Sequence, residues 1–149
     1  MRLRMKLRTD RDADFFNRLG REHLPGYLGV IVTAVEPGVL RAELPLRKEL
    51  FAPNGFLHAG TVITLADTAA GYGCVAHLPD DAEIFTTLEL KANFLRAARE
   101  GVLRCEARAV HLGRTTQVWD ATVYSGHDER PIAVFRCTQL VIYRDRLTH

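Results

Sequence analysis

The sequence predicts a single α+β domain in which an antiparallel sheet wraps around one long central helix. Two observations carry this prediction. Residues 60–77 are nearly all small or apolar over a length of four or more helical turns, which indicates a helix buried on most of its surface. Residues 87–143 contain four strand-like segments with short breaks between them, and short connections favour antiparallel neighbours. One sheet around one helix is the simplest packing of these elements.

Length and composition indicate one globular domain, residues 1–149, whose first 27 residues form an arm and a short helix. A chain of 149 residues buries roughly two-thirds of the surface of its unfolded form. Its net charge of +2 argues against a dedicated nucleic-acid binder. No stretch has the composition of a membrane span of about 20 apolar residues. We therefore expect neither nucleic acid nor a membrane as a partner.

The three cysteines are an odd number without Cys-x-x-Cys or Cys/His spacing, which argues against a disulfide framework and a zinc site. Their apolar surroundings indicate core thiols in a reducing compartment, so we expect a cytoplasmic protein without a metal. The basic and apolar start of the chain lacks the apolar region of a signal peptide, and we expect a solvated arm there. The cysteines are Cys74, Cys105 and Cys137.

A short helix and a hairpin are predicted before the long helix. Residues 12–23 have a weak helical pattern. Residues 28–35 and 39–44 have the composition of strands, and between them lies Glu36-Pro37-Gly38, a turn with Pro at i+1 and Gly at i+2. These elements would place a two-stranded hairpin directly before the loop that leads to the long helix.

Two features of the later elements make specific predictions. Gly71 and Gly73 in the long helix each cost about 1 kcal/mol relative to Ala, so we expect a neighbouring backbone to approach closely there. In the next segment Thr87, Glu89 and Lys91 alternate with apolar residues and are expected together on the polar face of the sheet. The remaining strand segments are 103–109, 117–123 and 132–143.

Asp67 is the one formally charged residue between Leu50 and Pro79, and it lies among small and apolar residues. An ionised carboxylate in such surroundings is costly unless partners or water compensate. Asp67 is therefore either bonded to a nearby hydroxyl, such as Thr64 or Thr68, or placed for chemistry. We favour chemistry.

The residues around this acid resemble the hotdog-fold thioesterases, and among them the PaaI-like acyl-CoA thioesterases of the phenylacetate pathway. The resemblance extends over residues 28–143, and residues 86–101 and 113–116 fit the later strands of the family. The family usually has Gly-Gly after the histidine, where this chain has Ala-Gly, and the interval from asparagine to histidine is shorter here than in many members. The motifs that carry the resemblance are Asn54-Gly55, His58-Ala59-Gly60 and Leu65-Ala66-Asp67-Thr68.

The resemblance implies hydrolysis of an acyl-CoA to free acid and CoA, with aromatic acyl groups among the candidates. Such a reaction needs a donor for the carbonyl oxygen and a carboxylate that attacks the carbonyl or activates water. The backbone N–H of Ala59 or Gly60, at the positive end of the long helix, is the predicted donor, with an oxyanion-hole effect of roughly 3 kcal/mol. Asp67 is the predicted carboxylate, as nucleophile or as general base.

Both groups lie on one helix, roughly 10 Å apart at a rise of 1.5 Å per residue, so one chain cannot easily present both to one carbonyl. The resemblance implies that two subunits pair, so that Asp67 of one chain faces the helix start of the other and a homodimer has two sites. A homotetramer of two such dimers is the common arrangement in the family. No cofactor is expected, since coenzyme A is part of the substrate.

Other residues are assigned roles by their position in the family. His58 orients the loop or bonds near the thioester, Asn54 donates to the carbonyl or forms the turn, and Thr87 carries a hydroxyl that helps to position water. The candidates for substrate binding are Phe56, Leu57 and Tyr72 for the acyl group, and Arg96 and Arg114 for the phosphates of coenzyme A.

Three other functions remain open. A hotdog hydratase or dehydratase acting on acyl thioesters is one, but the dehydratase-type His-Phe-Pro-Gly motif is absent from the sequence. A non-catalytic acyl-CoA-binding hotdog protein is another, against which the retained Asp67 argues. A plain structural domain would leave that acid unexplained. No nucleophile elbow, P-loop, HExxH motif or dinucleotide fingerprint indicates a different chemistry.

Overall fold

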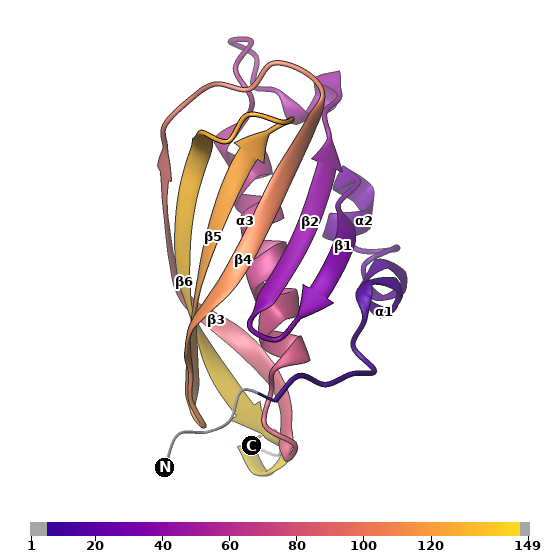
Figure 1. Cartoon of the computed structure of the whole chain (residues 1–149), viewed down its shortest axis with the longest axis vertical. Coiled ribbons are helices and arrows are strands. Elements are labelled where there is room, and N and C mark those ends of the chain that lie inside the picture. Colours follow the sequence, from indigo (N-terminus) through magenta and orange to yellow (C-terminus); the bar gives the residue numbers. More distant parts are fainter. Residues whose placement is uncertain (1–5, 147–149) are drawn as a thin grey trace.

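The structure of the chain, a computed structural model, describes residues 6–146 and consists of one sheet curved around one long helix (Figure 1). All neighbouring strands are antiparallel, and the six strands are ordered β1-β2-β4-β5-β6-β3. The predicted α+β fold is therefore confirmed. The strands are β1 (Ile31–Glu36), β2 (Val39–Pro45), β3 (Ala82–Phe94), β4 (Val102–Leu112), β5 (Thr116–Ser125) and β6 (Pro131–Tyr143). The helices are α1 (Ala13–Leu19), α2 (Leu24–Leu28) and α3 (Ala59–Ala76), with short 3-10 turns at Lys48–Leu50 and Arg144–Arg146.

The long helix α3 forms the core with the inner face of the sheet, which it contacts from β2 to β3. A methyl group on Gly73 would lie 2.7 Å from the ring of the fully buried Trp119. A methyl group on Gly71 would lie 3.0 Å from the ring of Phe85. The close approach predicted at both glycines is confirmed, but the approaching groups are aromatic side chains and not a neighbouring backbone.

The N-terminal segment differs from its prediction. The helix expected over residues 12–23 is the shorter α1, which ends at Gly20, and α2 follows it as a second helix that was not predicted. Asp12 caps α1 by accepting from the N–H of Phe15. The arm is not fully solvated, because the Arg8 guanidinium donates to the carbonyls of three residues, Leu78, Pro79 and Ala82. A cation is favourable at this end of α3, where helix carbonyls lack partners and the dipole is negative. The first five residues lie outside the described part.

Strand β3 is an edge of the sheet, and a bulge changes its pattern of side chains. Its register with β6 shifts between Thr87 and Glu89. Thr87 consequently lies opposite the buried Gln139, whereas Lys91 lines the exposed face of the sheet with charged neighbours. The prediction that Thr87 shares the polar face with Glu89 and Lys91 is wrong, because a bulge inserts one extra residue and reverses the alternation.

The three cysteines are free and buried, as predicted for core thiols. Burial raises the pKa of the Cys105 and Cys137 thiols to about 12. Within residues 6–146, no group of three or more His, Cys, Asp or Glu side chains could hold a metal ion. The helices in this part of the chain are too short or too polar to cross a membrane.

Candidate active site

The start of α3 is capped by the histidine that precedes it. His58 has an extended backbone, with φ −64° and ψ 131°, and its Nδ1 accepts the N–H of Gly60 at 2.8 Å. Its carbonyl accepts the N–H of Thr61 at 3.0 Å. Because Nδ1 is an acceptor, the neutral ring carries its proton on Nε2. His58 therefore shapes the turn into the helix.

This cap leaves one amide at the helix start uncommitted. The Gly60 N–H is bonded to His58, whereas the N–H of the exposed Ala59 has no acceptor among residues 6–146. The first N–H groups of a helix have no intrahelical partner and lie at the positive end of its dipole. Of the two predicted donors, Ala59 is thus the one available to a carbonyl oxygen.

A groove of about 460 Å³ opens beside this amide. The groove brings together four residues that the sequence singled out, Phe56, Leu57, Ala59 and Arg96. Its walls are mainly apolar, and the end of β3 with the following residues, 94–98, forms one side. Phe56 is 55% exposed, so an apolar group that entered the groove would cover it.

Asp67 lies two turns further along α3, where it is half-buried. Its Oδ1 is buried without a hydrogen bond to any residue from 6 to 146. Thr64, one of the hydroxyls proposed to hold it, donates instead to the carbonyl of Gly60 at 2.8 Å. Burial raises the pKa of the Asp67 carboxyl above its ordinary value. A structural role through hydrogen bonding is therefore not supported, and the acid is left with unmet hydrogen-bonding capacity.

The neighbourhood of Asp67 reaches Thr87 through two side chains of β6. The charge of Asp67 is close enough to the thiol of Cys137 to contribute to the raised pKa of that thiol, after burial. Cys137 Sγ accepts from Nε2 of Gln139 at 3.4 Å, and Gln139 Oε1 accepts from Thr87 Oγ1 at 2.7 Å. Gln139 was not predicted as a site residue, although a glutamine inside the apolar segment 132–143 was a signal for it.

Three other predicted residues have different surroundings. Asn54 Oδ1 accepts from the N–H of Phe56 at 3.2 Å, so its side chain forms the turn. Tyr72 stacks on Phe16 with ring centroids 4.6 Å apart and lies between α3 and α1. Arg114 is bound to Asp81, at 2.7 Å, beyond the C-terminal end of α3. Within one chain, neither Tyr72 nor Arg114 lines the groove beside Ala59.

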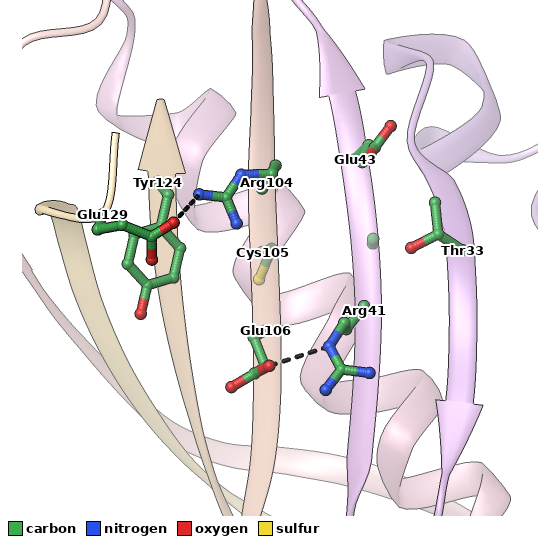
Figure 2. A pocket seen from close by; sticks show the side chains of 9 residues that line it. Thr33, Arg41, Glu43, Arg104, Cys105, Glu106, Tyr124 and Glu129 are labelled. Carbon is green, nitrogen blue, oxygen red and sulfur yellow. Dashed lines mark hydrogen bonds and ion pairs between the residues drawn. The ribbon is translucent and has the colours of Figure 1, made fainter. Parts of the chain in front are cut away.

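The outer face of the sheet carries another hollow, of about 250 Å³, lined by charged side chains (Figure 2). Figure 2 shows these side chains on the side of the strands away from α3. Its cations are already paired, since Arg41 bonds Glu106 at 2.9 Å and Arg104 lies 3.9 Å from Glu129. Both cations of the hollow are therefore paired, and none of the residues that line it also lines the groove beside Ala59.

The uncompensated carboxylate has a consequence for stability. Because the pKa of Asp67 is raised on folding, the folded state binds more protons, and stability falls as the pH rises from the unfolded value of 3.8 to the folded pKa. Asp67→Asn removes this penalty, so we expect the Tm at pH 7 to rise, by about 2–4 °C for each kcal/mol relieved. Thermal unfolding of Asp67→Asn beside Asp120→Asn, which breaks an exposed ion pair with Arg136, measures the effect. A lower Tm in Asp67→Asn would mean that the carboxylate has a stabilising partner.

Comparisons with known proteins agree with this geometry. Residues 54–132 match the thioesterase superfamily. The Pseudomonas aeruginosa protein PA1618 is 35% identical over 135 residues, which cover 88% of this chain and 90% of that protein. A crystal structure of a mutant of PA1618, there named a thioesterase, superposes with a TM-score of 0.85 at 32% identity. The match covers 92% of this chain and 98% of that chain.

Two further proteins are similar to this chain. The 1,4-dihydroxy-2-naphthoyl-CoA hydrolase of Listeria monocytogenes is 32% identical over 111 residues, covering 74% of this chain and 89% of that enzyme. The PaaI protein of the phenylacetic acid degradation operon of Escherichia coli superposes with a TM-score of 0.72, and the match covers 79% of this chain and 83% of that chain. At 23% identity, this similarity shows the fold alone. The chain therefore belongs to the thioesterase superfamily, as a hotdog-fold thioester hydrolase.

Proposed function

We propose that this chain hydrolyses acyl-CoA thioesters at a site shared between two copies, with Asp67 of one subunit opposite Ala59 of the partner subunit. The observation that carries the proposal is the pair of unsatisfied groups on α3: a half-buried carboxylate without a hydrogen-bond partner, and a helix-start N–H without an acceptor within the described residues. Along the helix they are about 12 Å apart, which is too far for one carbonyl group to meet both.

Strand β3 offers the surface for this pairing. It is a 13-residue edge strand, and such a strand has unpaired N–H and C=O groups along its open side. Apolar side chains on it are 40–58% exposed in the single chain, which is unusual for an edge that stays in water. Antiparallel pairing of β3 with its copy around a two-fold axis would satisfy the backbone and cover these residues. They are Ile84, Leu88, Leu90 and Phe94.

The proposed reaction uses water and no cofactor. Asp67, as general base, takes one proton while the water oxygen bonds to the carbonyl carbon, and the N–H of Ala59 of the partner subunit stabilises the oxyanion. The carbon–sulfur bond then breaks, and the proton passes from Asp67 to the departing sulfur, which gives a carboxylic acid and free CoA. Direct attack by Asp67 as a nucleophile is the alternative for the first step.

The groove beside Ala59 favours an aromatic or otherwise apolar acyl-CoA. Phe56, Leu57 and Phe94 line it, and the hydrolase from Listeria acts, by its name, on a naphthoyl-CoA. Arg96, on the rim of the same groove, is the proposed phosphate contact in preference to Arg114, which is paired with Asp81.

The buried free thiols fit a reducing, cytoplasmic location. Pairing of two dimers into a tetramer stays part of the proposal.

Release of free thiol from a panel of acyl-CoAs tests the function. The panel contains acetyl-, hexanoyl-, benzoyl-, phenylacetyl- and crotonyl-CoA, and we expect kcat/KM of about 10⁴ M⁻¹s⁻¹ or more for at least one aromatic member. Tight binding without turnover of any member would replace the proposal with a non-catalytic acyl-CoA-binding protein. Loss of the crotonyl double bond without thiol release would replace it with a hydratase.

A further inference from the structure

The core between α3 and the sheet holds buried polar side chains that nothing in the mechanism above explains. Burying an amide or hydroxyl is unfavourable unless hydrogen bonds compensate, so each buried polar group needs an account of its partners. Within residues 6–146 the buried polar and charged residues are Thr61, His77, Gln117 and Gln139.

The first three hold the fold together. Thr61 donates to the carbonyl of Leu50, and His77 connects Gly38 and Gly73 through its two ring nitrogens. Gln117 joins the indole of Trp119 to the carbonyl of His77. None of these bonds involves Asp67, Ala59 or another residue that lines the groove beside Ala59.

Gln139 is the exception, because its partners lead to the proposed site. It is fully buried on β6 and lies directly between Gln117 of β5 and Thr87 of β3 in the sheet register. Its Nε2 donates to Cys137 Sγ at 3.4 Å, and its Oε1 accepts from the hydroxyl of Thr87 at 2.7 Å. The charge of Asp67 contributes, after burial, to the raised pKa of the same Cys137 thiol. Thr87 itself is exposed in the single chain, so only one side of its hydroxyl is held.

The direction of this last bond restricts what Thr87 can do. A threonine hydroxyl has one proton to donate and two lone pairs to accept with. Because the proton is committed to Gln139, any further partner of Thr87 has to be a donor. A water molecule fits this requirement, since it can donate one proton to Thr87 and the other to Asp67 while a lone pair faces the thioester carbon.

We infer that Gln139 is a positioning residue for hydrolysis: it fixes the rotamer of Thr87 and commits its hydroxyl to accept a hydrogen bond from the attacking water. The inference rests on the proposed function. It assigns to Gln139 an effect on catalysis through Thr87, and no contact with the substrate.

Gln139→Met tests this, with Gln117→Met as its matched control. Both replace a fully buried glutamine on the same row of the sheet by a side chain of similar shape, but only the first removes the acceptor for Thr87. We expect Gln139→Met to lower kcat about tenfold at unchanged KM, the scale of one hydrogen bond. Gln117→Met should destabilise the fold and leave kcat unchanged.

Coupling to Thr87 separates positioning from a structural effect. Thr87→Val should also lower kcat about tenfold, Thr87→Ser should keep most activity, and the double variant Thr87→Val with Gln139→Met should be no slower than either alone. Independent, multiplicative losses would overturn the inference. If Gln139→Met does not fold, Gln139→Asn, which withdraws the amide by one methylene, replaces it.

An NMR measurement tests the inference without turnover. The three-bond couplings of the Thr87 methyl carbon report its χ1 angle, and we expect one rotamer in the wild type and averaging in Gln139→Met but not in Gln117→Met. A single unchanged rotamer in Gln139→Met would overturn the inference even if the enzyme is active. Absence of turnover on the whole panel would instead remove the proposed function, and the couplings would still decide whether Gln139 fixes Thr87.

Discussion

Replacing Asp67 by asparagine is expected to lower kcat at least a hundredfold with little change in KM. The substitution keeps the size and polarity of the side chain but removes the group that accepts a proton from water or attacks the thioester. Positioned acid–base groups contribute about 10²–10⁴-fold. Because the Asp67 Oδ1 bonds no residue from 6 to 146, the change breaks no structural contact that those residues make with it. Thiol release at saturating acyl-CoA measures kcat.

The pH dependence gives this prediction a second, independent test. Only the ionised carboxylate acts as base, and burial raises its pKa above 3.8, so kcat/KM of the wild type should fall on the acidic side at a higher pH than an ordinary aspartate would give. Asp120→Asn, an exposed acid on the outer face, is the control and should keep both the rate and the profile. Full activity in Asp67→Asn would exclude the mechanism, whatever the profile.

The sequence was sufficient to predict the fold because the spacing of apolar residues differs strongly between the helices and the strands. The helix predicted over residues 60–77 is Ala59–Ala76, since a long apolar stretch rich in alanine and glycine has no other stable arrangement than a helix covered on most sides. The short N-terminal helix was predicted less well. Gly20 ends α1, but the apolar pattern of residues 12–23 does not show that a second helix, α2, begins at Leu24.

Strand parity failed at one point for a clear physical reason. Counting alternate residues assumes a regular strand, but a bulge lies between Thr87 and Glu89. No glycine or proline in this segment indicates the bulge in the sequence. The error mattered, because it placed Thr87 on the wrong face and so concealed its bond to Gln139. Hydrogen bonds between side chains on different strands depend on register, which no single segment encodes.

The candidate site was only partly readable from sequence. Asp67 stood out because an isolated charge in apolar surroundings is costly wherever the chain folds. The sequence does not show which N–H at the helix start is available to a substrate. His58 accepts the Gly60 N–H and leaves the Ala59 N–H available only because its ring adopts one orientation. Arg114 was assigned by position in the family, and its pairing with Asp81 follows from the meeting of two segments 33 residues apart.

Mixing two inactive variants is expected to restore activity if the site is shared between subunits. Ala59→Pro removes the one proposed donor with little disturbance, because proline is favoured at the first helical position and Ala59 is exposed. The extended backbone of His58 also suits a following proline. Alone, Ala59→Pro should lower kcat about 10²–10³-fold, as loss of an oxyanion-hole donor does. Retained activity in this variant would exclude Ala59 as the donor.

The recovery has a predictable size. In a heterodimer of Asp67→Asn and Ala59→Pro, one site combines the intact Asp67 of one chain with the intact Ala59 of the other, and the second site lacks both groups. Random reassociation makes half of the dimers mixed, with one working site of two, so about a quarter of wild-type activity should return. If differently tagged chains are refolded together and the mixed dimer is purified, that dimer should have about half of the wild-type activity. A purified mixed dimer as inactive as its parents would mean that each site is built within one chain, because a site that needs both groups from the same subunit stays broken in every combination of the two.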